Sequence, residues 1–139
     1  MTGPAPRRND DRGAAAVEMA VVLPLLLLIV LGIIEFGLGW NRQLNLTEAA
    51  HQGARVAAIN GDPAAVTQTV QQILGASAGN TQLDTSITTC DDDSAESATV
   101  DLTLYYDSPT GLGSLMAHFG RRNVTSFELH ATGVMPCVG

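Results

Sequence analysis

The sequence predicts an α+β protein in which one long N-terminal helix is followed by a short helix and a small antiparallel sheet of about three strands. Three observations lead to this fold class. A nearly uncharged apolar run lies within the first third of the 139-residue chain. Helix-type spacing of apolar residues continues after it, and beyond about residue 83 apolar and polar residues alternate. Repeats of three to four residues indicate a helix, and a repeat of two indicates a strand.

The apolar run has the length of a membrane span. No residue from Met19 to Ile34 is charged, and an apolar segment extends over 14–40 when Glu18 and Glu35 are included at its boundaries. A helix of that length measures about 40 Å, which exceeds the roughly 30 Å hydrocarbon core of a bilayer. A removed secretory signal is the alternative, but the bulky or charged residues of 35–40 contain no small-x-small cleavage site. We therefore expect a transmembrane helix over 14–40.

The arginines give the expected orientation. Arg7, Arg8 and Arg12 precede the span, whereas only Arg42 lies close behind it. Positive charge stays on the cytoplasmic side, so we expect the N-terminus inside and everything after the span outside a bacterial cytoplasmic membrane. Trp40, at the outer end, suits the aromatic belt of the membrane interface.

Glu18 is the feature of the span that most requires an explanation. A carboxylate at the centre of the hydrocarbon costs about 2.5–3.5 kcal/mol, so a cationic partner is expected. Cleavage between Gly13 and Ala14 would supply one, because the new α-amine of a neighbouring subunit could reach Glu18. The alternative is that Glu18 sits among the cytoplasmic headgroups and Gly13 in a loop.

These residues resemble a prepilin processing site, in which a peptidase cuts after Gly and Glu stands fifth in the mature chain. The leader is then residues 1–13, which are short, hydrophilic and basic. This stretch, Arg12–Glu18, together with three further ones makes the chain similar to the TadE-like family of minor pseudopilins of the tight-adherence pilus: Leu23–Leu28, Gly32–Gly37 and Ala49–Arg55. Met19 departs from the family, whose members often carry an aromatic residue there.

The resemblance implies a structural subunit and several partners. The expected partners are prepilin peptidase, a short major pilin, a sister pseudopilin, the membrane assembly platform of the pilus and the lipid bilayer. Because the family's fibre subunits are much shorter, it implies a minor role in pilus assembly. The rival interpretation is a membrane-anchored extracytoplasmic binding module whose helix is a simple tether.

A stalk helix is expected over 41–60, where small and apolar residues recur every three or four positions. Ala50, Gly53 and Ala54 on this face would let another helix approach closely, which suits a subunit contact. Packing of the same face on the chain's own domain is equally consistent with the pattern. Glu35 either marks the outer boundary of the span or pairs with a cation on a sister subunit.

Residues 62–139 are expected to form the exported α+β domain. Gly61, Asp62 and Pro63 predict the end of one helix and the capped start of another. The expected buried positions of the second helix are Val66, Val70, Ile73 and Leu74, and strands are expected around 83–89, 100–106 and 124–134, with a helical turn between 109 and 120.

Cys90 and Cys137 are the only cysteines in the chain. Both lie on the side of the membrane where oxidation is permitted, so we expect a disulfide between them. Two cysteines without a nearby histidine do not make a tetrahedral metal site.

Composition argues against several other functions. The chain has no lysine and a formal net charge of −7, and the first 13 residues carry three arginines and two aspartates, so their removal would leave −8. An acidic body argues against nucleic acid as a partner. His51, His118 and His130 are scattered without a catalytic pairing, so neither an enzyme nor a cofactor is expected. The acidic segment 91–96 is either a solvated hairpin tip or, less consistent with its lack of glycine, a calcium loop.

Overall fold

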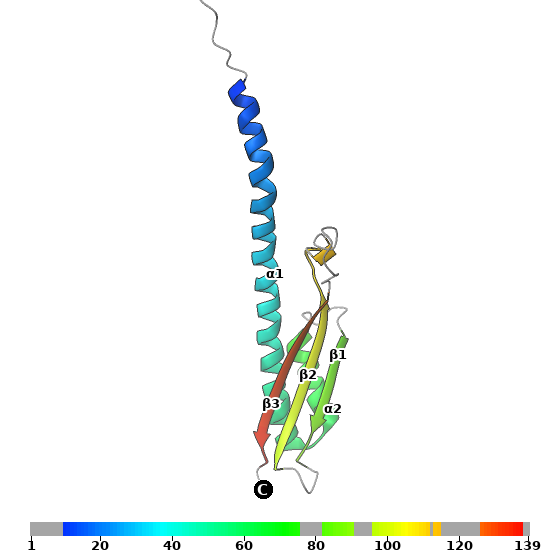
Figure 1. Cartoon of the computed structure of the whole chain (residues 1–139). Helices are drawn as coiled ribbons and strands as arrows, with labels where there is room; N and C mark the ends of the chain where they lie inside the picture. Colours follow the sequence, from blue (N-terminus) through cyan, green and yellow to red (C-terminus); the bar gives the residue numbers. More distant parts are fainter. Residues whose placement is uncertain (1–9, 76–81, 91–95, 112, 115–125, 138–139) are drawn as a thin grey trace, which may run out of the picture. The chain divides into compact units, whose positions relative to one another are not determined.

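A computed structural model of the chain describes residues 10–75, 82–90, 96–111, 113–114 and 126–137. The chain divides into two compact units, Met1–Ile34 and Glu35–Gly139. Each unit is described separately below. The expected α+β class is confirmed, with a long helix, a short helix and three antiparallel strands (Figure 1).

Helix α1 (Asp10–Asn60) supplies the first unit and begins the second. It continues through Pro24 as one uninterrupted element, and it starts before Ala14, so the Gly13–Ala14 bond lies within helical structure. Between Gly13 and Asn60 it contains a stretch long and apolar enough to cross a membrane. In the first unit the described side chains that form this stretch are almost all exposed, and none is buried.

Helix α2 (Pro63–Leu74) follows α1 after a two-residue break. Gly61 takes a positive φ of 62° and donates its amide to the carbonyl of Ala57, which ends α1. The side chain of Asp62 accepts a 2.9 Å hydrogen bond from the amide of Ala64, and Pro63 occupies the first turn. The expected stop, cap and first-turn residues are thereby confirmed.

The sheet contains β1 (Gln82–Thr88), β2 (Ser97–Asp107) and β3 (Ser126–Pro136) in the order β1-β2-β3, with both pairings antiparallel. Leu104 lies opposite Leu83 on one side and opposite Leu129 on the other. The expected third strand began two residues earlier, outside the described residues, and most of the expected turn over 109–120 also lies outside them. Figure 1 shows the three strands side by side with α2 behind them.

The core of the second unit lies between one face of the sheet and the two helices. Every second residue of β2 is buried, which is the pattern of a strand with one face covered. Helix α1 contributes mainly small side chains, so its backbone packs close to the sheet. The buried apolar residues are Leu46, Ala49, Ala50, Ala54, Ala57, Val66, Val70, Leu74, Ala98, Val100, Leu102, Leu104, Tyr106 and Ala131.

The backbones of α1 and β3 approach each other closely at Gly133. A Cβ added at Gly133 would lie 2.1 Å from the carbonyl oxygen of Ala50, closer than real Cβ atoms come to any neighbour. The side-chain amide of Gln43 also donates a 2.9 Å hydrogen bond to the carbonyl of His130. The backbone edge of β3 is therefore held directly against α1.

Candidate assembly site

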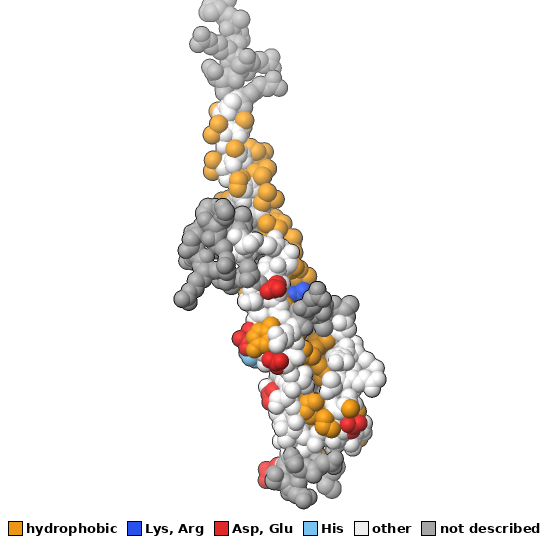
Figure 2. Space-filling model, turned by 90° about the vertical axis from the view of Figure 1, so that its right-hand side faces the viewer, with side chains coloured by type: hydrophobic (Ala, Val, Ile, Leu, Met, Phe, Trp, Pro, Cys, Tyr) orange, Lys and Arg blue, Asp and Glu red, His pale blue; other side chains and the backbone are white. Residues whose placement is uncertain are grey.

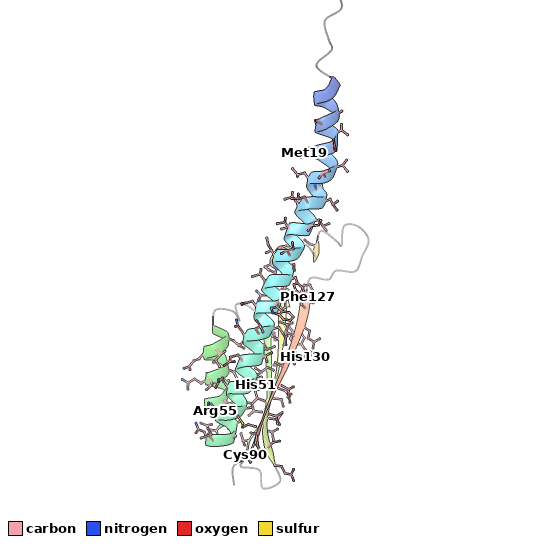
Figure 3. All side chains as sticks on the ribbon, turned by 90° about the vertical axis from the view of Figure 1, so that its left-hand side faces the viewer. Met19, His51, Arg55, Cys90, Phe127 and His130 are labelled. Atoms are coloured by element: carbon pink, nitrogen blue, oxygen red, sulfur yellow. A yellow bond between two sulfur atoms is a disulfide. The ribbon has the colours of Figure 1, made fainter. Side chains whose placement is uncertain are left out.

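Residues 13–34, the part of the first unit whose side chains are described, present an apolar surface with one carboxylate, that of Glu18. Figure 2 shows hydrophobic side chains gathered along the N-terminal part of α1, and Figure 3 shows side chains standing out from this part of the helix, with Met19 labelled. The exposed large apolar residues in this unit are Val17, Met19, Val21, Val22, Leu23, Leu25, Leu26, Leu27, Leu28, Ile29, Val30, Ile33 and Ile34. Such a surface requires lipid or other apolar helices around it, because water solvates it poorly.

Glu18 lies on this surface with its side chain exposed. Within the described part of the chain, no hydrogen bond or ion pair reaches its carboxylate. Gly13, five residues earlier, is also exposed, and a Cβ added there would meet no atom within 4 Å. The geometry therefore leaves both residues accessible to a second molecule, and this chain supplies no cation to Glu18 from its described residues.

Glu35 behaves differently, because the second unit, to which it belongs, supplies its contact. The hydroxyl of Thr110, just after β2, donates a short hydrogen bond to Glu35 Oε2. One turn along the helix, Gly39 leaves room for the Tyr106 hydroxyl, which lies 2.8 Å from where a Cβ would be. Neither of the two roles considered for Glu35 included this contact within the chain.

Arg42, two turns after Glu35 on α1, also contacts Tyr106. Its guanidinium carbon lies 4.4 Å from the centroid of the Tyr106 ring, and that ring stacks on Phe127 of β3 at 5.4 Å. Burial is the largest cause that raises the pKa of Tyr106 above its ordinary value, while the positive charge of Arg42 acts in the opposite direction. Three buried polar atoms here have no hydrogen-bond partner among the described residues: Glu35 Oε1, Arg42 Nη1 and Ser108 Oγ.

The face that carries Ala50, Gly53 and Ala54 is occupied within the chain. Ala50 and Ala54 are fully buried, and a Cβ on Gly53 would meet Val70, Val100 and Val66 at 3.1–3.5 Å. These residues therefore pack on the helix and sheet of the second unit, which is the second of the two interpretations of this face. They are not exposed to a second subunit in this structure.

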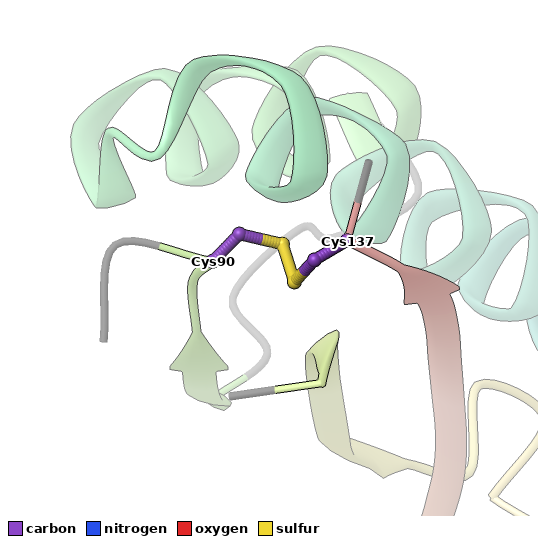
Figure 4. Close-up of a disulfide and its surroundings, with 2 residues drawn as sticks. All are labelled: Cys90 and Cys137. Carbon is purple, nitrogen blue, oxygen red and sulfur yellow. A yellow bond between two sulfur atoms is a disulfide. The ribbon is translucent and has the colours of Figure 1, made fainter. Parts of the chain in front are cut away.

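The structure contains the Cys90–Cys137 disulfide, with a Cα–Cα distance of 5.7 Å (Figure 4). It joins the end of β1 to the residue after β3, so it links the two edge strands of the sheet at one end. The amide of Cys137 also donates a 3.1 Å hydrogen bond to the carbonyl of Glu96, just before β2.

No metal or catalytic constellation is present among the residues that the structure describes. They include no group of three or more His, Cys, Asp or Glu side chains placed to hold a metal ion. His130 hydrogen-bonds through Nδ1 to the Thr103 hydroxyl at 3.0 Å and lies 3.1 Å from the Glu128 carboxylate, both on the outer face of the sheet. His118 and the acidic residues 91–95 lie outside the described ranges.

Sequence reasoning did not find that Tyr106 of β2 contacts α1, where its ring lies against Arg42 and its hydroxyl against Gly39. The available signal was the seven-residue spacing of Glu35 and Arg42, which places both on one helical face two turns apart. This face continues toward Leu46 and Ala49, which are buried. Periodicity identifies such a face, but it does not identify the strand that covers it.

An exposed apolar helix long enough to cross a bilayer, followed by a small disulfide-linked α+β unit, suggests a membrane-anchored protein. The family model described as TadE-like protein matches residues 13–55, which supports membership of this family. The family is structural and pilus-related. No curated protein and no solved structure matched the chain.

Proposed function

We propose that the chain is a minor pilin-like subunit, a pseudopilin, that helps to assemble a tight-adherence, type IV-like pilus. The match of residues 13–55 to the TadE-like family supports this role. The observation that carries it is Glu18, an exposed carboxylate on an otherwise apolar helix surface. Since such a group is costly in lipid, its presence favours a cation delivered by a neighbouring subunit.

In this proposal prepilin peptidase cuts after Gly13. The arginines of the leader keep the N-terminus in the cytoplasm, and the unit from Glu35 onward is exported. The new α-amine at Ala14 of one subunit then pairs with Glu18 of the next. The partners are the peptidase, a short major pilin, a sister pseudopilin and the assembly platform, all of which meet the chain in or at the bilayer.

The test measures pilus assembly in cells that carry Glu18→Ala, Glu18→Gln or Glu48→Ala. Glu48 is the matched control, because it is an exposed glutamate of the same helix that lies outside the apolar stretch. We expect both Glu18 variants to lose most assembly and Glu48→Ala to retain it. Normal pili in the Glu18→Ala strain would contradict the proposal.

Two further measurements separate processing from anchoring. Mass spectrometry of the protein from its natural membrane should find Ala14 as the first residue, and an intact leader would overturn the processing step. Replacement of residues 19–34 by an unrelated apolar helix should abolish assembly. If all function survives that replacement, the chain is the tethered binding module of the rival interpretation.

A further inference from the structure

The bond that the peptidase is proposed to cut lies inside a helix. Helix α1 begins at Asp10, so the Gly13–Ala14 bond falls where its first turn meets its second. In an α-helix the amide of Ala14 donates to the carbonyl of Asp10, and the carbonyl of Gly13 accepts from the amide of Val17. The backbone groups on both sides of the bond are therefore engaged within the helix.

Hydrolysis requires this bond in a different conformation. One water is added across it: the hydroxyl goes to the carbonyl carbon of Gly13, and the hydrogen goes to the nitrogen of Ala14. An enzyme that holds a peptide through main-chain hydrogen bonds takes it as an extended segment. The intrahelical bonds leave the amides and carbonyls of residues 10–17 occupied. This stretch must therefore unwind before it is cut.

The glycine at position 13 has no structural reason within the chain itself. Positive φ values, which favour glycine, occur among the described residues at Gly61, Gly75 and Gly111 and not at Gly13. A Cβ at Gly13 would meet no atom within 4 Å. Alanine would therefore fit at this position, and it is the best helix former, whereas glycine is the worst after proline.

This weak position of the helix coincides with the bond. Gly13 is the only glycine of α1 before Gly32, and the three residues that follow it are alanines. Because α1 starts three residues earlier, opening can begin at its free end, where the first amides have no intrahelical acceptor. Opening stops where the span begins, since unpaired backbone groups are strongly unfavourable in hydrocarbon.

We propose that Gly13 permits the cut by weakening the end of α1, so that residues 10–17 unwind and enter the peptidase as an extended segment. The cleavage rate then follows the equilibrium population of the unwound form, as it does for other locally opened proteins. The inference rests on the proposed function, which supplies the peptidase, and deepens it by assigning the conformation that the enzyme recognises. Glycine acts here through the helix and not by leaving room for a pocket of the enzyme.

The test measures how fast purified prepilin peptidase releases the Ala14 terminus from the full chain in detergent, by mass spectrometry. Ala16→Gly weakens the helix close to the bond and should raise the initial rate about fivefold, the ratio that the helix propensities of alanine and glycine give. Gly13→Ala should lower the rate by a similar factor. The matched control is Ala20→Gly, the same exchange further along α1, which should leave the rate unchanged.

The double variant Gly13→Ala with Ala16→Gly separates the two explanations of the glycine. If Gly13 acts through the helix, the second substitution restores the rate to within about twofold of the unaltered chain. A double variant as slow as Gly13→Ala would show that the enzyme reads the missing side chain itself. That result would overturn the proposal, as would an unchanged rate in Ala16→Gly.

Amide hydrogen exchange without the peptidase gives an independent readout. The amide of Val17 should exchange about fivefold faster in Ala16→Gly and about fivefold slower in Gly13→Ala. Equal exchange rates in the two variants would contradict opening at this site. If the unaltered chain is not cut at all, the proposed function fails and this inference with it. If every variant is cut at the same rate, this inference alone fails.

Discussion

At the scale of single residues, Gly133 is a position of the second unit that has no room for a side chain. A Cβ there would lie 2.1 Å from the oxygen of Ala50 and 2.9 Å from the amide nitrogen of His51, and neither backbone atom can rotate away. We expect Gly133→Ala to destabilise the unit by about 1–3 kcal/mol or more, as overpacking does. Urea unfolding of the full chain in detergent measures this.

The matched control for Gly133 is Gly37→Ala, because a Cβ at Gly37 meets nothing within 4 Å. Alanine is also the better helix former, so this variant should be neutral or slightly more stable. Equal unfolding midpoints for the two variants would show that β3 does not pack on α1 as closely as the structure places it.

We expect Tyr106 to make the free energy of unfolding of the second unit depend on pH in the alkaline range. Burial, and to a smaller degree the charge of Glu35, raise the pKa of its phenol, although Arg42 acts against them. A group whose pKa is raised by folding binds its proton more tightly in the folded state. Its contribution is complete below the unfolded pKa of about 10 and is lost as pH rises from there through the folded pKa. The free energy of unfolding should therefore fall above about pH 10.

The check is urea unfolding between pH 9 and 11. Tyr106→Phe should reduce the alkaline loss of stability, because it removes the titrating hydroxyl. Tyr105 also has a raised pKa, caused mainly by its hydrogen bond to Glu128, so Tyr105→Phe serves as the exposed comparison. If Tyr106→Phe has the same pH profile as the unaltered chain, the ring is not buried in solution.

At the scale of the elements, the disulfide holds the two edge strands at one end of the sheet. Cys90 and Cys137 are 47 residues apart in sequence, so the bond closes a long loop. Its removal in the double variant Cys90→Ala with Cys137→Ala should cost about 2–4 kcal/mol. The measurement is the unfolding midpoint with and without reductant. Reductant should lower the midpoint of the unaltered chain and not that of the double variant, and a midpoint insensitive to reductant in both would contradict the bond.

The elements themselves were largely predictable from local patterns. The Gly61-Asp62-Pro63 boundary, the second helix and the alternation of β2 follow from residues within a few positions of one another. The contacts between elements were not predictable in this way. Thr110 reaches Glu35 across 75 residues, and neither residue carries a local signal for the other.

The small-residue face of α1 shows the same limit in the candidate site. Ala50 and Ala54 suit a close contact equally well whether the neighbour is a second subunit or the chain's own sheet. The glycine at position 133 decides the outcome, since it lets β3 approach Ala50. The roles of Gly13 and Glu18 stay predictions, because they rest on local spacing and on the bilayer and not on a contact within the chain.

At the scale of the whole molecule, the two units depend on different surroundings. The first unit has only exposed or half-buried side chains among those described, so it has no core of its own. Its backbone groups can pair within the helix, as a bilayer requires, except at Pro24, which has no amide hydrogen to donate. Every residue of the buried apolar core belongs to the second unit. We therefore expect the second unit to fold without the first.

This separation predicts opposite results for two fragments. Residues 35–139 should be soluble, form the disulfide and unfold cooperatively, because they retain the complete core. Residues 61–139 should not fold, because they lack the part of α1 that covers the sheet and contributes Leu46, Ala49, Ala50, Ala54 and Ala57. Circular dichroism during thermal unfolding distinguishes the two. A cooperative transition in residues 61–139 would show that the sheet and α2 form a core without α1. If residues 35–139 lack a cooperative transition, the second unit depends on the first part of α1 for its fold.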